Sequence, residues 1–173
     1  MIEAVSDDVR MPNVDPTLPA ADGSTPDPAP VLRDMTPHLP YGKMPLLERL
    51  GVRFDSAGNG LCEGSWNPIN EACNPNGGVQ GGLFGVIFDA AMSMAIHSAL
   101  PPSDSCVSLE IRAATPGGGR AGDSFRLVGK VLKLGNSAIF AEAWAYKGDE
   151  VAATGSGTFL RRRKPPKAQR RQD

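Results

Sequence analysis

The longest apolar run of the chain extends from Leu83 to Leu100 and ends at Pro101 and Pro102. Its length fits either a membrane-spanning helix or a helix that a sheet buries on most sides. Asp89 lies within the run, and an ionised carboxylate is unfavourable in lipid. Because no second hydrophobic segment follows, the pattern predicts the buried helix of a globular domain and no membrane span.

Shorter segments on both sides of this helix have the residue types of strands. After the helix, strand character is found in residues 107–114, 124–134, 137–146 and 151–160. The last two connections between these segments are short enough for hairpins, which predicts an antiparallel meander. Before the helix, a short helix and two short strands are predicted at residues 44–50, 52–54 and 60–66. The predicted fold class is therefore α+β, with one long helix held by an antiparallel sheet of about six strands.

The two ends of the chain differ in composition from the part between them. Residues 1–40 carry eight of the sixteen prolines, seven acidic residues and no periodic apolar pattern, which predicts a disordered arm. Residues 161–173 contain seven Lys or Arg with no interleaved aromatic residues, which predicts a solvated basic tail rather than a nucleic-acid site. Residues 41–160 are predicted to form the one folded domain.

Composition and residue counts narrow the kinds of site that are expected. The net charge is −1, with 18 basic and 19 acidic residues, so the folded part has no strong field of its own. The three cysteines form no CxxC pair and no secretory signal precedes them, which favours the cytoplasm. The two histidines, His38 and His97, lie far apart in sequence and give little support to a zinc site or a histidine-dependent triad. No metal is expected.

The segment Asn74–Gly82 is rich in Gly and Asn and runs directly into the long helix. Glycines at a helix start allow the backbone to approach a ligand, and the free N–H groups there favour developing negative charge. This is the outline of an oxyanion hole, although a Gly-rich loop in isolation also fits a simple tight turn. Asp89 favours the functional interpretation, because a carboxylate within an apolar helix must be paired, hydrogen-bonded or functional.

The spacing of these features predicts a site that two subunits share. Gly81 and Asp89 are eight residues apart, which is roughly 12 Å along one helix, so they cannot both contact one small reacting group. If the glycine amides and the carboxylate serve the same reaction, Asp89 must meet the helix start of a second subunit across a two-fold axis. The consequence is a homodimer with two composite sites.

Several spaced elements together resemble one known family. They are Asn74, Gln80-Gly81-Gly82, Asp89, Ser105–Ile111, Pro116, Gly122-Asp123 and Leu134–Ser137. In this order they resemble the phenylacetyl-CoA thioesterase-like branch of the 4-hydroxybenzoyl-CoA thioesterase superfamily, over about residues 44–160. The resemblance implies the hotdog fold, in which an antiparallel sheet wraps around a long helix. It also implies hydrolysis of an acyl- or aryl-CoA thioester to the free acid and CoA by a homodimer or dimer of dimers, with no cofactor because coenzyme A is part of the substrate.

The resemblance also implies roles at the matching positions. The backbone N–H of Gly81, with Gly82 beside it, polarises the thioester carbonyl, and Asn74 helps to place substrate or water. Asp89 is the nucleophile or the general base that activates water, and the resemblance leaves both roles open. Ser108 matches a serine that positions water or orients the carboxylate, with an ordinary strand serine as the alternative.

One position departs from the pattern of the family. The residue before the two glycines is commonly histidine in this branch, and here it is Gln80. Glutamine donates hydrogen bonds but does not titrate near neutral pH, which puts any mechanism that needs a histidine proton in doubt. A non-catalytic acyl-CoA-binding protein is therefore kept as an alternative. A hotdog dehydratase or hydratase is less favoured, because it needs a histidine with an acidic partner and nothing recommends His97.

Further residues are candidates for contacts around the site. Ser93, one turn after Asp89, is a second candidate to orient the carboxylate, with helix packing as the alternative. Cationic side chains are candidates for the phosphates of coenzyme A, with solvated surface charges as the alternative interpretation. These cationic candidates are Arg112, Arg120, Lys133 and Arg161.

Overall fold

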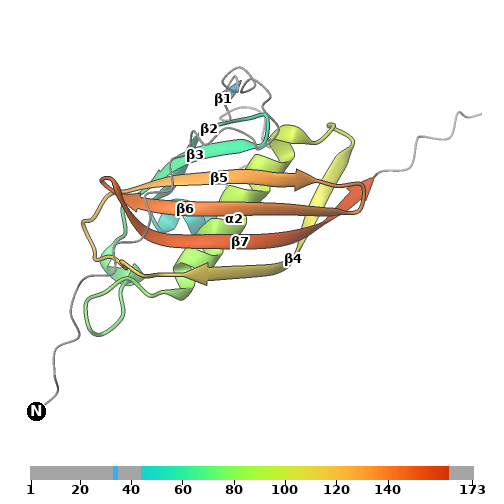
Figure 1. The fold of residues 1–173 in the computed structure, drawn as a ribbon. Coiled ribbons are helices and arrows are strands. Elements are labelled where there is room, and N and C mark those ends of the chain that lie inside the picture. Colours follow the sequence, from blue (N-terminus) through green and yellow to red (C-terminus); the bar gives the residue numbers. More distant parts are fainter. Residues whose placement is uncertain (1–32, 35–43, 164–173) are drawn as a thin grey trace, which may run out of the picture.

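The computed structural model describes residues 33–34 and 44–163, which form an antiparallel sheet with one long helix against it (Figure 1). The elements in chain order are β1 (Arg33–Asp34), α1 (Pro45–Arg49), β2 (Val52–Gly58), β3 (Leu61–Trp66), the short 3-10 helix η1 (Asn70–Ala72), α2 (Gly82–Ala99), β4 (Asp104–Ala114), β5 (Phe125–Leu134), β6 (Ala138–Lys147) and β7 (Glu150–Arg163). The remaining residues of the predicted arm and tail lie outside the described residues.

The sheet contains seven strands in the order β1-β2-β3-β5-β6-β7-β4, and every neighbouring pair is antiparallel. β1, which falls inside the predicted arm, has only two residues, so the other six strands are the sheet that the sequence predicted. β5, β6 and β7 form the predicted meander. β4 returns after α2 to pair with β7, and among the described strands its other side is an edge of the sheet (Figure 1).

α2 is the predicted long helix, and the sheet covers its inward side. By length and composition the helix would also suit a membrane span. Its inward residues instead form the core of the domain: Phe84, Ile87, Phe88, Ala91, Met92, Met94, Ala95 and Ile96. Leu100 is extended, because a proline disfavours helical backbone in the residue before it. The helix therefore ends just before the two prolines.

Glycines in the sheet let α2 approach the strands closely. A Cβ on Gly129 of β5 would lie 2.4 Å from the backbone oxygen of Ala91, and a Cβ on Gly155 of β7 would lie 2.5 Å from the ring of Phe88. Any side chain larger than hydrogen would therefore push α2 away from the sheet. The helix rests on the backbone of the strands, which sets the height of Asp89 above them.

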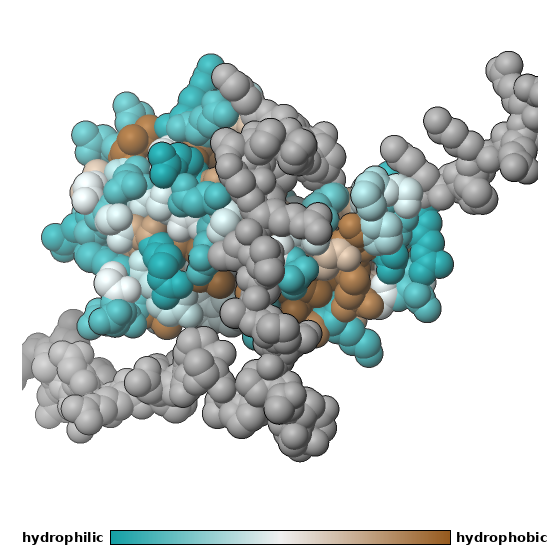
Figure 2. All heavy atoms as spheres, turned by 90° about the horizontal axis from the view of Figure 1, so that it is seen from above, coloured by the Kyte–Doolittle hydropathy of each residue, from teal (hydrophilic) through white to brown (hydrophobic). Residues whose placement is uncertain are grey.

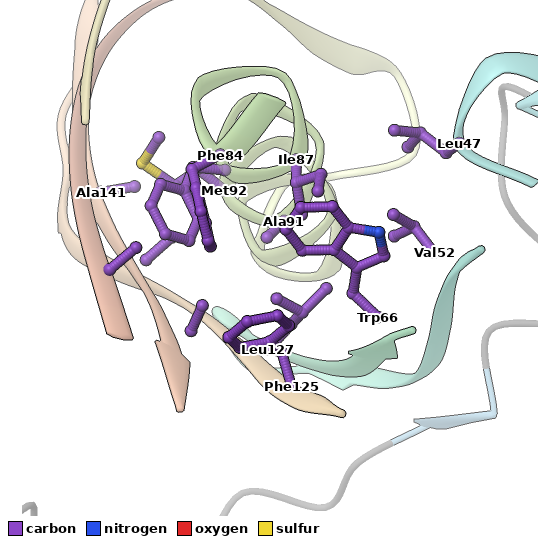
Figure 3. Close-up of a cluster of buried hydrophobic side chains, with 14 of the residues drawn as sticks. Leu47, Val52, Trp66, Phe84, Ile87, Ala91, Met92, Phe125, Leu127 and Ala141 are labelled. Atoms are coloured by element: carbon purple, nitrogen blue, oxygen red, sulfur yellow. The ribbon is translucent and has the colours of Figure 1, made fainter. Parts of the chain in front are cut away.

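An aromatic cluster anchors the first half of α2 to the sheet (Figure 3). The rings of Trp66 and Phe84 meet edge to face with centroids 5.1 Å apart, and Trp66 stacks on Phe125 at 5.4 Å. All three side chains are buried, and the indole N–H donates a hydrogen bond to the carbonyl oxygen of Leu50 at 2.8 Å. Ring pairs of this kind contribute roughly 0.5–1.5 kcal/mol beyond their burial, so the start of α2 is held firmly in place.

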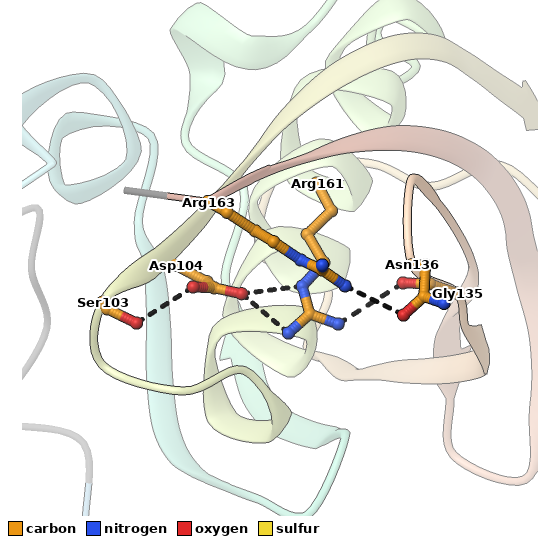
Figure 4. A network of polar contacts seen from close by, with 6 residues as sticks. All are labelled: Ser103, Asp104, Gly135, Asn136, Arg161 and Arg163. Carbon is orange, nitrogen blue, oxygen red and sulfur yellow. Dashed lines mark hydrogen bonds and ion pairs between the residues drawn. The ribbon is translucent and has the colours of Figure 1, made fainter. Parts of the chain in front are cut away.

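One boundary of the folded domain differs from the prediction. β7 continues to Arg163, three residues past the predicted boundary, because its last residues pair with the start of β4. Arg161 forms an ion pair with Asp104 at 2.7 Å, and the two side chains are only 14% and 8% exposed (Figure 4). The first three arginines of the predicted basic tail therefore belong to the sheet.

Candidate active site

Asp89 and Ser108 meet although 19 residues separate them in sequence. The hydroxyl of Ser108 on β4 donates a hydrogen bond to Oδ1 of Asp89 on α2, at 2.6 Å. A β-bulge between Ser108 and Glu110 interrupts the pairing of β4 with β7, and bulges commonly re-aim a side chain beside a site. Leu109, the extra residue, is 63% exposed, while Ser108 points to the helix. One hydroxyl thus orients a half-buried carboxylate.

A second polar group lies one helix turn further along the seam between α2 and β4. Sγ of Cys106 lies 3.7 Å from Nδ1 of His97, and that nitrogen is 2.7 Å from the carbonyl oxygen of Ser93. Burial and, after it, the negative charge of Asp89 raise the pKa of the Cys106 thiol to about 11. Among the described residues, the side-chain hydrogen bond to the Asp89 carboxylate comes from Ser108 and not from Ser93.

The start of α2 presents backbone N–H groups without acceptors. Gly81 is the N-cap residue and Gly82 is the first helical residue, and no side chain caps the helix. Within the described part of the chain, neither N–H donates a hydrogen bond to a backbone carbonyl. A Cβ on Gly82 would meet nothing within 4 Å, so the backbone here is open to a ligand. Donors at the positive end of a helix suit an oxygen that acquires negative charge.

The loop before α2 uses Asn74 to hold its own shape. The side-chain oxygen of Asn74 accepts a hydrogen bond from the N–H of Asn76 at 2.9 Å, and the Asn74 N–H donates to the carbonyl oxygen of Gly78 at 2.7 Å. The side-chain oxygen thus has a structural role that the sequence did not predict, which leaves the side-chain NH2 group for the predicted contact to substrate or water. Gln80 is exposed and directly precedes Gly81.

Asp89 and the open amides lie on one continuous helix, so a single chain keeps them about 12 Å apart. Exposed apolar side chains lie near these residues in sequence: Val86 on α2, one turn before Asp89, and Val107 and Leu109, on either side of Ser108 in β4, are 40%, 42% and 63% exposed. Elsewhere the surface is mixed, and Figure 2 shows apolar patches set among hydrophilic residues. An edge strand with exposed apolar residues is a surface suited to pairing with another chain.

The four cationic candidates do not gather at one place. Arg112 pairs with Glu110 at 2.8 Å and lines two shallow depressions of about 380 Å³ and 210 Å³, to which no residue of α2 contributes. Arg120 and Lys133 are exposed. Arg161 is held in the ion pair of Figure 4, which leaves the predicted phosphate contact of this residue without support. Among residues 33–34 and 44–163, no three His, Cys, Asp or Glu side chains are placed to hold a metal ion.

Sequence reasoning missed one residue at the helix start. Thr115 directly follows β4, and its Oγ1 lies 3.8 Å from the position that a Cβ on Gly81 would take. It comes four residues after Ile111, which packs against the core, so the period of two of a strand places it on the helix side of the sheet. That period was a usable signal, but the approach of the end of β4 to the helix start was not readable from the sequence.

Comparison with known proteins identifies relatives over part of the chain. No protein-family model matches it. The curated relative "Putative esterase PA0474" of Pseudomonas aeruginosa is 31% identical over 87 residues, which are 50% of this chain and 65% of that protein. The chain thus spans just under two thirds of the length of this relative.

Solved structures match the chain over a larger part of its length. A conserved protein of Pseudomonas aeruginosa has a TM-score of 0.65 and 27% identity, covering 69% of this chain and 94% of that one. A phenylacetic acid degradation-related protein of Ralstonia eutropha has a TM-score of 0.63 and 21% identity, with coverage of 68% and 90%. A thioesterase of Pseudomonas aeruginosa has a TM-score of 0.63 and 21% identity, with coverage of 69% and 86%. The chain therefore has the predicted hotdog fold, and the solved structures that it resembles include a thioesterase and a protein related to phenylacetic acid degradation.

Proposed function

We propose that the protein is a thioesterase that hydrolyses an acyl- or aryl-CoA thioester to the free acid and coenzyme A. The observation that carries the proposal is the 2.6 Å hydrogen bond from Ser108 to Asp89, which holds a half-buried carboxylate in one orientation. The amides of Gly81 and Gly82, which have no acceptor among the described residues, supply the matching group, because hydrolysis of a thioester needs donors for the carbonyl oxygen as well as a base or nucleophile. The names of the similar proteins support the same reaction class.

The two halves of the site have separate roles in this proposal. The amides of Gly81 and Gly82 polarise the thioester carbonyl, and Asp89 of the other subunit acts at the carbonyl carbon. As a general base, Asp89 takes a proton from the attacking water, and the departing thiolate of coenzyme A is protonated when the C–S bond breaks. As a nucleophile, Asp89 forms an acyl anhydride and releases the thiolate, and water then hydrolyses the anhydride. The bond from Ser108 orients the carboxylate in both routes.

The proposal requires at least a homodimer, and a dimer of dimers satisfies it equally. The open edge of β4 supports this assembly, since a second copy placed there would cover the exposed side chains of Val107 and Leu109. Arg112, Arg120 and Lys133 remain the candidates for the phosphates of coenzyme A. We assign the protein to the cytoplasm, in keeping with three free thiols in the described residues.

A non-catalytic acyl-CoA-binding protein is the second candidate, and Gln80 is the observation that favours it. The side chain is exposed beside the helix start and cannot exchange a proton near neutral pH. The oriented carboxylate of Asp89 argues for catalysis, because a pure binding pocket has little need of a half-buried charge. A dehydratase or hydratase fits less well, since the bond that orients Asp89 comes from Ser108 and not from a histidine.

Thiol release from a panel of CoA thioesters tests the proposal. Benzoyl-, phenylacetyl- and hexanoyl-CoA are offered to the purified protein and to its Asp89→Asn variant. Asp149→Asn, on the exposed turn before β7, is the matched control for loss of one carboxylate. Turnover that is lost only in Asp89→Asn supports the thioesterase. Binding without turnover in the unmodified protein would instead support the acyl-CoA-binding candidate.

A further inference from the structure

Within the described residues, three hydrogen-bond donors at or beside the start of α2 have no acceptor. Two are the N–H groups of Gly81 and Gly82, and the third is the hydroxyl of Thr115. Oγ1 of Thr115 lies 3.8 Å from the Cβ position of Gly81, where no other group outside the neighbouring residues comes within 4 Å. In the described part of the chain this hydroxyl has no hydrogen-bond partner. A glycine at position 81 therefore leaves open the space between the helix start and the hydroxyl.

The backbone on both sides of Thr115 is fixed. The residue before it ends the ladder with β7, and the N–H groups of Gly117 and Gly118 after it both donate to one carbonyl oxygen of β7, at 3.0 and 3.2 Å. The loop that follows is tied to the segment before α2, since the N–H of Val79 donates to the carbonyl oxygen of Gly119 at 2.7 Å. The backbone at Thr115 is thus held beside the helix start by main-chain hydrogen bonds, and the exposed side chain rotates about its own torsions.

We propose that Thr115 is a third hydrogen-bond donor to the thioester carbonyl, in the half of the site that contains Gly81 and Gly82. This inference rests on the proposed thioesterase function. As water or Asp89 adds to the carbonyl carbon, the electron pair of the C=O bond moves to oxygen. The hydroxyl of Thr115 donates a hydrogen bond to that oxygen and keeps its own proton. Because a hydroxyl rotates, it can follow the oxygen from the planar substrate to the tetrahedral intermediate.

The Thr115→Val variant removes the hydroxyl and keeps the shape of the side chain. We expect kcat to fall about ten- to a hundredfold, somewhat less than for loss of a single essential oxyanion donor, with KM changed by less than about threefold. Thr115→Ser, which keeps the hydroxyl, is expected to retain most of the activity. Thr158→Val, on the side of β7 facing away from α2, is the matched control. If the Thr115→Val and Thr115→Ser variants lose activity equally, or if Thr115→Val loses none, the proposed role of the hydroxyl is overturned.

An infrared measurement tests the same contact without turnover. Phenylacetyl-CoA labelled with carbon-13 at the thioester carbonyl is bound to the Asp89→Asn protein, with and without Thr115→Val. In the Asp89→Asn protein, the carbonyl stretch of the bound thioester is expected at a lower frequency than in free phenylacetyl-CoA. Adding Thr115→Val is expected to reverse part of this lowering. If the unmodified protein binds the thioester but hydrolyses none of the panel, the proposed function fails, and the band still decides the role of Thr115. An unchanged band overturns the contact.

Mixed dimers test which subunit supplies the hydroxyl. A dimer of one Asp89→Asn chain and one Thr115→Val chain, isolated with two affinity tags, has both defects in one composite site and neither in the other. Its activity is expected to return to about half that of the unmodified dimer, far above either variant alone. Verified mixed dimers that show no recovery would overturn the placement of Thr115 in the half-site opposite Asp89.

Discussion

Replacing Ser108 with alanine removes the hydroxyl that orients the Asp89 carboxylate. The bond length of 2.6 Å lies in the range of charge-assisted O–H···O⁻ bonds, which contribute roughly 1.5–3 kcal/mol. Because Asp89 is only half-buried and Ser108 is exposed in one chain, water competes for the carboxylate, and we take the lower end of this range. About 1.5 kcal/mol expressed in the transition state corresponds to a roughly tenfold lower kcat. Asp89→Asn is expected to lose far more, since it removes the reacting group.

Steady-state thiol release from the best CoA thioester of the panel measures this effect. Ser105→Ala is the matched control, because Ser105 lies on the same strand but pairs opposite Arg162, away from Asp89. Equal unfolding free energies of the variants, measured with urea, would show that the loss is local. A Ser108→Ala protein with kcat within twofold of the unmodified protein, when Asp89→Asn is inactive, would refute the assigned orientation.

Three further predictions concern the packing of α2 against the sheet, the Asp104–Arg161 ion pair and the effect of the Asp89 charge on Cys106. Gly129→Ala places a Cβ 2.4 Å from the oxygen of Ala91 and should destabilise the protein by about 1–3 kcal/mol in urea unfolding; no loss would contradict the close approach. The hydrogen bond from the Arg161 guanidinium lowers the pKa of Asp104 in the folded protein below the ordinary value of 3.8. The ion pair therefore stabilises the fold fully above pH 3.8, and this stabilisation is lost as the pH falls through the lowered pKa of the folded state. In the Asp104→Asn variant, the unfolding free energy should therefore fall less steeply as the pH is lowered into the acid range. The same steepness as in the unmodified protein would contradict this prediction. Asp89→Asn removes a negative charge that raises the pKa of Cys106, so iodoacetamide should label this thiol faster at pH 9, as followed by mass spectrometry.

The fold was predictable where a local pattern was strong. The uninterrupted apolar run from Leu83 to Leu100 predicted α2 almost to its ends, and short turn segments predicted the β5-β6-β7 meander. The extension of β7 to Arg163 was not predictable, because three consecutive arginines have the composition of a solvated tail. The carboxylate of Asp104, contributed by a strand far away in sequence, and the carbonyl oxygen of Gly135 make a largely buried guanidinium acceptable there.

The sequence named Asp89 and the glycine pair of the candidate site, but it did not predict their contacts. Asp89 is a charge in an apolar helix, and a glycine pair before a helix is a visible signal, so both halves could be named from the sequence. Which serine reaches the carboxylate depends on the bulge in β4, and the choice of Ser108 over Ser93 follows from that local geometry. Thr115 is a single threonine at a strand end, and only the three-dimensional path of the chain brings it to Gly81.

The two sides of α2 can diverge independently. Its inward side meets glycines of the sheet at Gly129 and Gly155, where a Cβ would clash, and packs through Phe84 on the aromatic side chains of Trp66 and Phe125. Its outward side carries Val86, which lies one turn before Asp89 and is 40% exposed. Replacing Val86 changes the surface beside the carboxylate without removing a residue of the core. In the proposed thioesterase, substrate preference is thus adjustable at this position of the helix at little expense to folding.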